Sequence, residues 1–312
     1  MVIFAALSIS LGKTWVPVTA LLDRSNESDW LVITQLRLPR TILAIVVGAG
    51  LGVAGAVMQG YLRNPLADPG VLGVSSCAAL GAVLSLRLGY TVNAPWTLPL
   101  LAMTGAASAV ILLTVLAGRA GSAITFILAG VMVSAVAGAL TSLVLSLTDD
   151  PYAAAEIINW LMGALTDRSF DDVMFAVPLV IIGIALLLMT GRSLDALTLG
   201  EDTARSLGVR LGRLQFLVAL GVGTAVGAAV AATGVIGFVG LIVPHLLRPL
   251  VGEQPSRLLL PSALAGAVLV LAADIAVRLT PGVQETKLGV AMALFGGPFF
   301  LILLMRLRRQ II

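Results

Sequence analysis

The chain has 312 residues, of which 59% are apolar and 11% charged, and its formal net charge is +3. Uncharged runs of up to 34 residues exclude a soluble two-domain protein, because about 20 apolar residues are enough to cross a bilayer core. The single cysteine, Cys77, excludes a disulfide or a cysteine metal cluster, and the small basic excess concerns membrane topology rather than nucleic acid.

The apolar runs predict one all-α, polytopic membrane domain over residues 1–312. The run 1–11 covers only about 16 Å at 1.5 Å per residue, so we expect it to be the truncated tail of a longer first helix. Counting that run, we expect ten transmembrane spans. They are 1–11, 41–60, 71–86, 98–117, 124–147, 173–190, 214–233, 234–251, 258–273 and 288–305.

The segment before the second span is polar. Gly12-Lys13-Thr14 resembles part of a phosphate-binding loop, but Leu7 stands where that loop needs a glycine, so we reject a nucleotide site. Residues 23–36 are expected to form a polar connector with an apolar patch. Arg37 and Arg40 follow at the mouth of the span, where two arginines either bind an acidic partner or anchor at lipid headgroups.

Small residues recur at every fourth position of the second span and of the span from 214. Such a stripe lets another helix, or a substrate, approach closely. Helix packing is the commoner explanation, and a translocation path is the alternative. The positions are Gly48, Gly52, Ala56 and Gly60, and then Ala219, Gly223, Gly227 and Ala231.

Several connectors interrupt the spans. Residues 63–70, RNPLADPG, contain two prolines and a glycine and therefore predict a tight non-helical turn. Residues 118–122, GRAGS, form a short basic turn. Residues 152–165 are apolar but too short to span, so we expect a re-entrant or interfacial helix with Trp160 at the membrane surface, able to cover a cavity.

The last third of the membrane region contains three polar features. The uncharged run 214–247 is expected to hold two helices broken at Thr233-Gly234. His245 is the single histidine; a metal or haem-iron ligand is conceivable, but we expect a structural role. Asp274 and Arg278 stand four apart on one helical face and are expected to pair.

Residues 192–213 form a charged island with four arginines and three acids between two apolar runs. Its part 200–208 begins with glycine and two acids and ends on glycine, which predicts a short helix with Glu201 and Arg205 on one face. This helix either docks a soluble partner or is a solvated loop that follows the positive-inside rule.

The charges of the connectors test the span list. Counting back from the C-terminal Arg306, Arg308 and Arg309, the inner side receives eleven basic groups against five acids, and the outer side eight against eleven. This asymmetry supports ten spans with both chain ends in the cytoplasm.

The sequence disfavours chemistry within the chain. No expected span carries an ionisable residue away from its ends, as a secondary transporter usually requires. No HExxH or GxSxG motif occurs, so a protease is disfavoured as well. We expect no catalytic residue, metal or cofactor, which leaves a passive conduit powered by another protein, as in the permease subunit of an ATP-driven transporter.

Five sequence blocks, in order, resemble the permeases of type II ABC importers for ferric siderophores, haem and vitamin B12. They are RLPRTILAIVVGAGLGVAGAVMQGYLRNPLADPGVLGVS, LGEDTARSLGV, GVIGFVGLIVPHLLR, LAADIAVRL and LFGGPFFL. The resemblance implies a homodimer of ten-helix subunits in the bacterial inner membrane. It also implies two cytoplasmic ATP-binding cassette subunits, which hold ATP and magnesium, and a periplasmic binding protein that delivers the substrate.

The resemblance also implies roles for particular residues. The residues that couple to the ATPase would be Gly200, Glu201, Ala204, Arg205, Leu207 and Gly208. The residues that dock the binding protein would be Arg37, Arg40 and Arg278. The residues of the translocation path and its cytoplasmic gate would be Gly48, Gly52, Gly55, Asn64, Leu66, Ala123, Ile124 and Leu128.

The cargo is not decided by any residue. Haem or a ferric siderophore is preferred over cobalamin because iron cargo is the commoner assignment in the family that the chain resembles. A carrier or exporter that works without an ATPase is the alternative from a different class.

Overall fold

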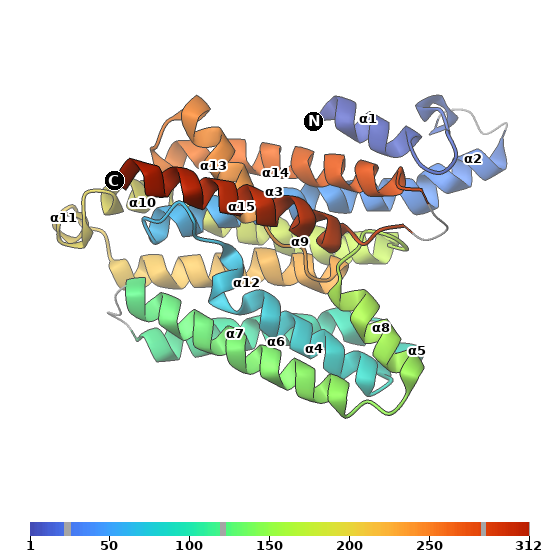
Figure 1. Cartoon of the computed structure of the whole chain (residues 1–312), viewed down its shortest axis with the longest axis horizontal. Coiled ribbons are helices and arrows are strands. Elements are labelled where there is room, and N and C mark those ends of the chain that lie inside the picture. Colours follow the sequence, from blue (N-terminus) through green and yellow to red (C-terminus); the bar gives the residue numbers. More distant parts are fainter. Residues whose placement is uncertain (22–25, 119–122, 282–284, 312) are drawn as a thin grey trace.

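The computed structural model describes residues 1–21, 26–118, 123–281 and 285–311, without the side chains of residue 21 and residues 306–311. All regular structure in these ranges is helical (Figure 1). Seven helices are long and apolar enough to cross a membrane, and two shorter apolar helices accompany them. With the short N-terminal helix they account for the ten predicted spans. The predicted turn at 118–122 falls outside the described residues from position 119 on.

The helices follow one another through short connections. In chain order the helices are α1 (Val2–Ser10), α2 (Glu27–Leu31), α3 (Leu38–Tyr61), α4 (Val74–Arg87), α5 (Tyr90–Asn93), α6 (Thr97–Ala117), α7 (Ala123–Ser146), α8 (Pro151–Leu161), α9 (Phe170–Leu188), α10 (Gly191–Leu197), α11 (Glu201–Ser206), α12 (Leu211–Thr233), α13 (Val239–Val251), α14 (Pro255–Arg278) and α15 (Leu288–Ile311). Three further turns are η1 (Val18–Leu21), the π-helical η2 (Val32–Arg37) and η3 (Pro69–Leu72).

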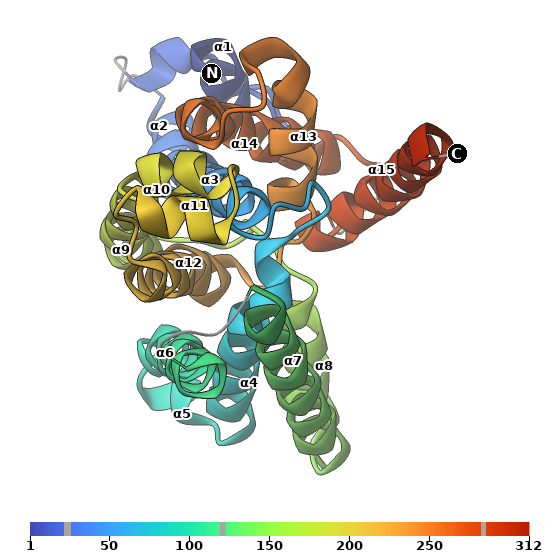
Figure 2. The same cartoon turned by 90° about the vertical axis from the view of Figure 1, so that its left-hand side faces the viewer.

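Two helices, α3 and α12, form the buried centre of the bundle. Figure 2 shows α13 and α14 on one side of them and α4, α6 and α7 on the other, with α15 at the margin. Helix α3 packs mainly on α14, α9 and α13, and α12 packs mainly on α9 and α6. By contrast, α7, α9 and α15 keep most of their surface outside the bundle. A helix that is apolar all round is expected where it is enclosed by other helices or faces lipid.

Glycines allow α3 to approach its neighbours backbone to backbone. A Cβ at Gly48 would overlap the carbonyl of Gly266 in α14, and one at Gly52 would overlap the carbonyl of Ser262 in the same helix. Close approach of this kind is how helices associate tightly inside a bilayer, where lipid removes most of the hydrophobic advantage of packing. The first small-residue stripe is therefore a helix-packing surface.

The predicted polar connector at 23–36 is wrong for the residues that the structure describes from Glu27 on. Helix α2, turn η2 and α3 form one continuous helix of 35 residues, Glu27–Tyr61. The Asn26 side chain accepts a hydrogen bond from the backbone N–H of Asp29 and so caps the start of this helix. Two acids in the first turn stabilise the helix further, because they lie at the positive end of its dipole. Pro39 is tolerated because the wider π-helical turn η2 comes directly before it.

The break between α12 and α13 occurs where the sequence predicts it, at Gly234. There the backbone has a φ of +72° and lies against the carbonyl of Trp160, so that a side chain would overlap it. The backbone N–H of Ala164 donates to the Thr233 carbonyl at 2.8 Å. Trp160 belongs to the buried core, and the segment after α8 folds inward onto the break. The re-entrant or interfacial placement of this helix stays a prediction.

Different helices lie at the two ends of the bundle. Figure 1 places the C-terminus, α10 and α11 at one end, and α2, α5 and α8 at the other. We call these the coupling end and the outer end. The charge-based assignment of the connectors agrees with this division.

The glycine contact makes a direct prediction. Gly52→Ala should lower the thermal stability of the purified protein markedly, because the new Cβ would meet backbone of α14 that cannot rotate away. Gly138→Ala in α7 is the matched control, since nothing lies within 4 Å of a Cβ there. The control should be neutral, or more stable by up to ~1 kcal/mol from helix propensity. Equal melting temperatures for the two variants would contradict the packing role of Gly52.

Candidate functional site

Two short helices, α10 and α11, lie at the coupling end (Figure 1). Helix α11 covers Glu201–Ser206, two residues shorter at its C-terminal side than the predicted segment 200–208. Gly200 and Gly208 flank it with positive φ values of 101° and 87°, a backbone region that favours glycine. Ala204 is buried and fixes the helix to the core, whereas Leu207 keeps 62% of its surface exposed.

Charges on α11 are arranged as the spacing predicts. Arg205 lies 3.8 Å from Glu201 and 3.1 Å from Asp202, with the arginine side chain 53% exposed. Exposed pairs of this kind contribute little to stability. The helix thus presents a mixed-charge surface with one exposed leucine at its end, which is a surface suited to a protein partner.

Helix α10 is tied to the start of α14 by Asp195. The Asp195 carboxylate accepts from the Gln254 side chain and from the Ser256 backbone N–H, both at 2.9 Å. It thereby caps a helix whose own N-cap residue makes no side-chain bond. Burial by itself would raise the pKa of Asp195. The hydrogen bonds from Ser256 and Gln254 to its carboxylate outweigh this effect, so the pKa lies below its ordinary value. These two bonds join α10 directly to the start of α14.

The connector between α3 and η3 contains two of the predicted gate residues. Asn64 is exposed, and its side-chain oxygen accepts from the backbone N–H of Leu66 at 2.9 Å. The Asp68 carboxylate caps η3 through the N–H of Gly70 at 2.8 Å. Burial raises the pKa of Asp68, and the bond from Gly70 opposes this shift only in part. The connector is a rigid turn held by its own side chains.

The start of α7 lies beside this connector. The rings of Tyr61, at the end of α3, and Phe126 meet edge to face with centroids 5.4 Å apart. On the same first turns of α7, Ile124 and Leu128 are 69% and 59% exposed, and Ala123 is half-buried. The structure therefore brings the two parts of the predicted gate together, with apolar side chains facing outward from the subunit.

The predicted path glycines have a different placement. Gly48 and Gly52 contact α14, and Gly55 contacts Gly240 in α13 so closely that a Cβ would overlap its backbone. All three are buried within the subunit. Their part in a translocation path stays a prediction, and the contacts that are present are those of helix packing.

At the outer end, three predicted arginines form one cluster with acids. Arg40 donates to both oxygens of Asp274 at 2.8–3.1 Å and lies 2.8 Å from Glu285. Arg278 pairs with Asp274 from one helical turn further along α14, which confirms that predicted pair. Asp274 is fully buried, so both guanidinium groups are needed to stabilise its charge.

The remaining donors of the cluster cap α1. Arg37 donates to the carbonyls of Ile9 at 2.9 Å, Ser10 at 2.6 Å and Thr14 at 2.7 Å. Arg278 donates to the carbonyl of Ser8 at 2.6 Å. The last carbonyls of a helix have no partner within it and form its negative end, so arginines bind them well. Arg37 and Arg278 thus fasten α1 to the bundle.

A cavity of about 330 Å³ opens beside this cluster. Arg37, Arg40 and Arg278 all line it, together with Lys13 and Arg168 from other segments. Burial lowers the pKa of Arg168, which lies in the loop between α8 and α9, although Asp172 and Asp167 oppose that shift. The docking role of the three arginines is not tested by these contacts, which occupy most of their donors within the chain.

The sequence did not predict the polar contacts of one buried amide inside the bundle. Gln59 in α3 is buried; its amide nitrogen lies 3.3 Å from the carbonyls of Gly240 and Leu241, and its oxygen accepts from Arg248 at 3.0 Å. The signal was an isolated amide in an otherwise apolar span, which must find partners when buried. His245 packs its ring against Phe299, with centroids 6.0 Å apart.

The described residues thus form an enclosed helical bundle with seven candidate membrane spans, a turn beside the exposed start of α7, and a short charged helix at one end. The FecCD transport family matches residues 1–306. The chain belongs to that family.

Named relatives resemble the chain over almost its whole length. The hemin transport system permease protein HmuU of Yersinia pestis is 38% identical, with 98% of this chain and 90% of the relative covered. The Fe(3+) dicitrate transport system permease protein FecD of Escherichia coli is 40% identical, with 97% and 95% covered. The vitamin B12 import system permease protein BtuC of Vibrio cholerae is 39% identical, with 96% and 89% covered.

A solved structure supports the same fold. It is described as an inward-facing conformation of a metal-chelate type ABC transporter, and it superposes with a TM-score of 0.89 at 32% identity over 98% of this chain and 96% of its own. The chain is therefore a permease of the type II ABC importer family.

The buried acid at the outer end gives a stability prediction. Asp274→Ala would leave the buried Arg278 and the half-buried Arg40 without their shared carboxylate, and we expect a loss of about 3–5 kcal/mol in unfolding free energy. Asp202→Ala removes an acid from the exposed α11 pair and should cost less than about 1 kcal/mol. Thermal unfolding of both variants in detergent measures the difference. A similar small loss for both would show that the Asp274 pairs do not hold the outer end.

Proposed function

We propose that the chain is the membrane-spanning subunit of a bacterial inner-membrane importer that moves haem or a ferric siderophore. In this proposal two copies form the translocation path, and two cytoplasmic ATP-binding cassette subunits supply the energy. A periplasmic binding protein delivers the cargo. The chain itself hydrolyses nothing.

The observation that carries the proposal is the exposed helix α11. Its exposed Leu207 and the charged face of Arg205 offer the contact that a soluble ATPase needs. Asp195 and its bonds to α14 would pass a push on this helix into the bundle. A carrier without an ATPase would have no use for such an arrangement.

The homodimer is supported by the outward faces of α7 and α15. Both helices are only lightly covered by the rest of the subunit, and Ile124 and Leu128 lie exposed beside the connector of Asn64 and Leu66. Two copies that meet along these faces would surround one axis with these four gate residues. Cargo would then pass between subunits rather than through one.

The proposed orientation places the coupling end in the cytoplasm. The C-terminus lies at the same end as α11 (Figure 1), and the basic connectors gather at that end as the positive-inside rule requires. The binding protein would approach the opposite end, where Arg37, Arg40 and Arg278 line one cavity.

Two alternatives remain distinct from this proposal. A vitamin B12 importer would have the same architecture, and relatives named for hemin, Fe(3+) dicitrate and vitamin B12 are 38–40% identical, so identity does not choose the cargo. A secondary carrier would need a carboxylate that gains and loses a proton. Asp274 is the buried candidate, but Arg40 and Arg278 both bind its carboxylate within the chain.

Copurification with the ATPase tests the proposal. Glu201→Arg and Arg205→Glu should each reduce the soluble ATPase retained on the tagged permease by about tenfold or more, because the contact surface would carry the wrong charge. Glu156→Arg, a reversal at an exposed position of α8 at the outer end, is the control and should retain the ATPase. Retention by all three variants would mean that α11 is not the coupling contact.

Docking of the binding protein makes a separate prediction. The double variant Arg37→Glu and Arg40→Glu should weaken its affinity by about 1–3 kcal/mol, as for other charge-assisted contacts. Asp274→Ala serves as the control, because it loosens the cluster but keeps both arginines. If affinity in folded fractions falls equally in the two, the arginines act through the fold and not through docking.

A further inference from the structure

A group of arginines at the coupling end has no acidic partner. Arg192 in α10, with Arg210 and Arg213 at the start of α12, line a cavity of about 520 Å³. None of the three forms an ion pair or side-chain hydrogen bond within the described part of the chain. No acid is among the described residues that line this cavity. We call Arg192, Arg210 and Arg213 the arginine trio.

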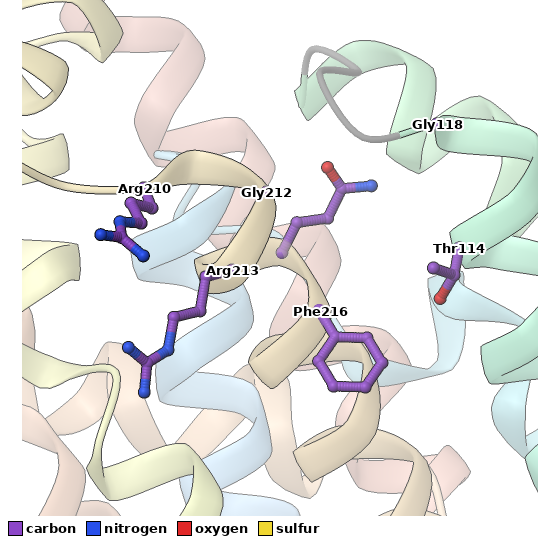
Figure 3. A pocket seen from close by; sticks show the side chains of 7 residues that line it. Thr114, Gly118, Arg210, Gly212, Arg213 and Phe216 are labelled. Atoms are coloured by element: carbon purple, nitrogen blue, oxygen red, sulfur yellow. The ribbon is translucent and has the colours of Figure 1, made fainter.

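Figure 3 shows how two of these side chains lie. Arg210 and Arg213 extend side by side from the first turn of α12, away from Thr114 and Gly118 at the end of α6. Both arginines line the cavity that they share with Arg192. A second cavity of about 650 Å³ adjoins the same two arginines and contains Phe216 on the α6 side.

The start of α12 adds to the positive potential. Arg210 is the N-cap residue, its side chain makes no capping bond, and the first turn holds no acid. The free N–H groups of such a turn attract anions. Two helices therefore bring together three arginines that have no ion-pair partner among the described residues and a helix start that has no side-chain cap. This arrangement is suited to binding one phosphate group.

The surroundings of the trio are apolar on the membrane side. Met189, at the end of α9, is 64% exposed and lines the same cavity with Leu217 of α12. The outer face of α9 continues this apolar surface through Ile182, Ile181 and Met174, all of them exposed. A ligand that fills the site must therefore be anionic at one end and apolar at the other.

We propose that the arginine trio binds the headgroup phosphate of an anionic phospholipid, with its acyl chains along the exposed face of α9. Basic pockets between spans on the cytoplasmic side hold such headgroups in membrane proteins. A soluble protein would reach the arginines but not the apolar face of α9, which lies within the span. Because the lipid would touch both α10 and α12, it would brace the charged island against the bundle.

Native mass spectrometry of the purified, delipidated chain tests this proposal. We expect phosphatidylglycerol to bind at least about tenfold more tightly than phosphatidylcholine with the same acyl chains. The triple variant Arg192→Gln, Arg210→Gln and Arg213→Gln should lose this preference. Arg257→Gln, at an exposed position of the first turn of α14 near the same end, is the control and should keep it.

Further arms separate the possible sources of the phosphate and guard against misfolding. The corresponding triple lysine variant keeps the charge and should retain most of the preference. Inorganic phosphate at millimolar concentration should not displace the lipid; full displacement would assign the site to a free anion. Equal binding of the two lipids, or an unchanged preference in the glutamine variant, would overturn the proposal. So would loss of ATPase retention in the glutamine variant with lipid preference intact, because the trio would then be a protein contact.

Discussion

Backbone contact between α3 and its neighbours is the constraint on which the rest of the structure depends. In a bilayer, an apolar side chain gains little free energy when it moves from contact with lipid to contact with another helix. Helices that must stay together therefore rely on close packing and polar contacts. Gly48, Gly52 and Gly55 supply the close packing along α3. Gln59 adds a buried polar contact that reaches Arg248 in α13. With α3 fixed in this way, its two ends are held at set positions across the membrane.

Each end of α3 then carries one of the candidate sites. At its start, Arg40 binds the buried Asp274, and Arg37 closes the C-terminal end of α1. At its end, Tyr61 meets Phe126 and sets the connector of Asn64 beside the exposed first turns of α7. Helix α14, packed along α3, receives Asp195 from the charged island. These contacts connect α10 to the start of α14 and, through Asp274, α14 to the cluster at the other end.

Local features of the sequence were enough to predict most of the fold. Uncharged length predicted the spans, Gly234 the break between α12 and α13, and two glycines around a charged segment the helix α11. The pair of Asp274 and Arg278 followed from helical spacing alone. Each of these depends on neighbours in the sequence, so no tertiary information was needed.

Features that depend on distant partners were missed or left open. Residues 27–36 were predicted to be a connector because of their polar side chains. In the structure they are helical, since η2 and α3 continue the helix that begins at Glu27. Arg40 gave no sign that its partners were Asp274 and Glu285, more than 200 residues away. The glycine stripe was compatible with both a path and a packing surface; its contacts with α14 are those of packing, and the path role stays a prediction. The docking, gate and coupling roles follow from resemblance and remain to be measured.

ATP-dependent uptake into liposomes tests the central claim most directly. The permease would be reconstituted with its ATPase and binding protein and offered haem, a ferric siderophore and cobalamin in parallel. We expect one iron cargo to accumulate, and only when ATP is present on the side of the ATPase. Accumulation driven by an ion gradient in vesicles without the ATPase would contradict it.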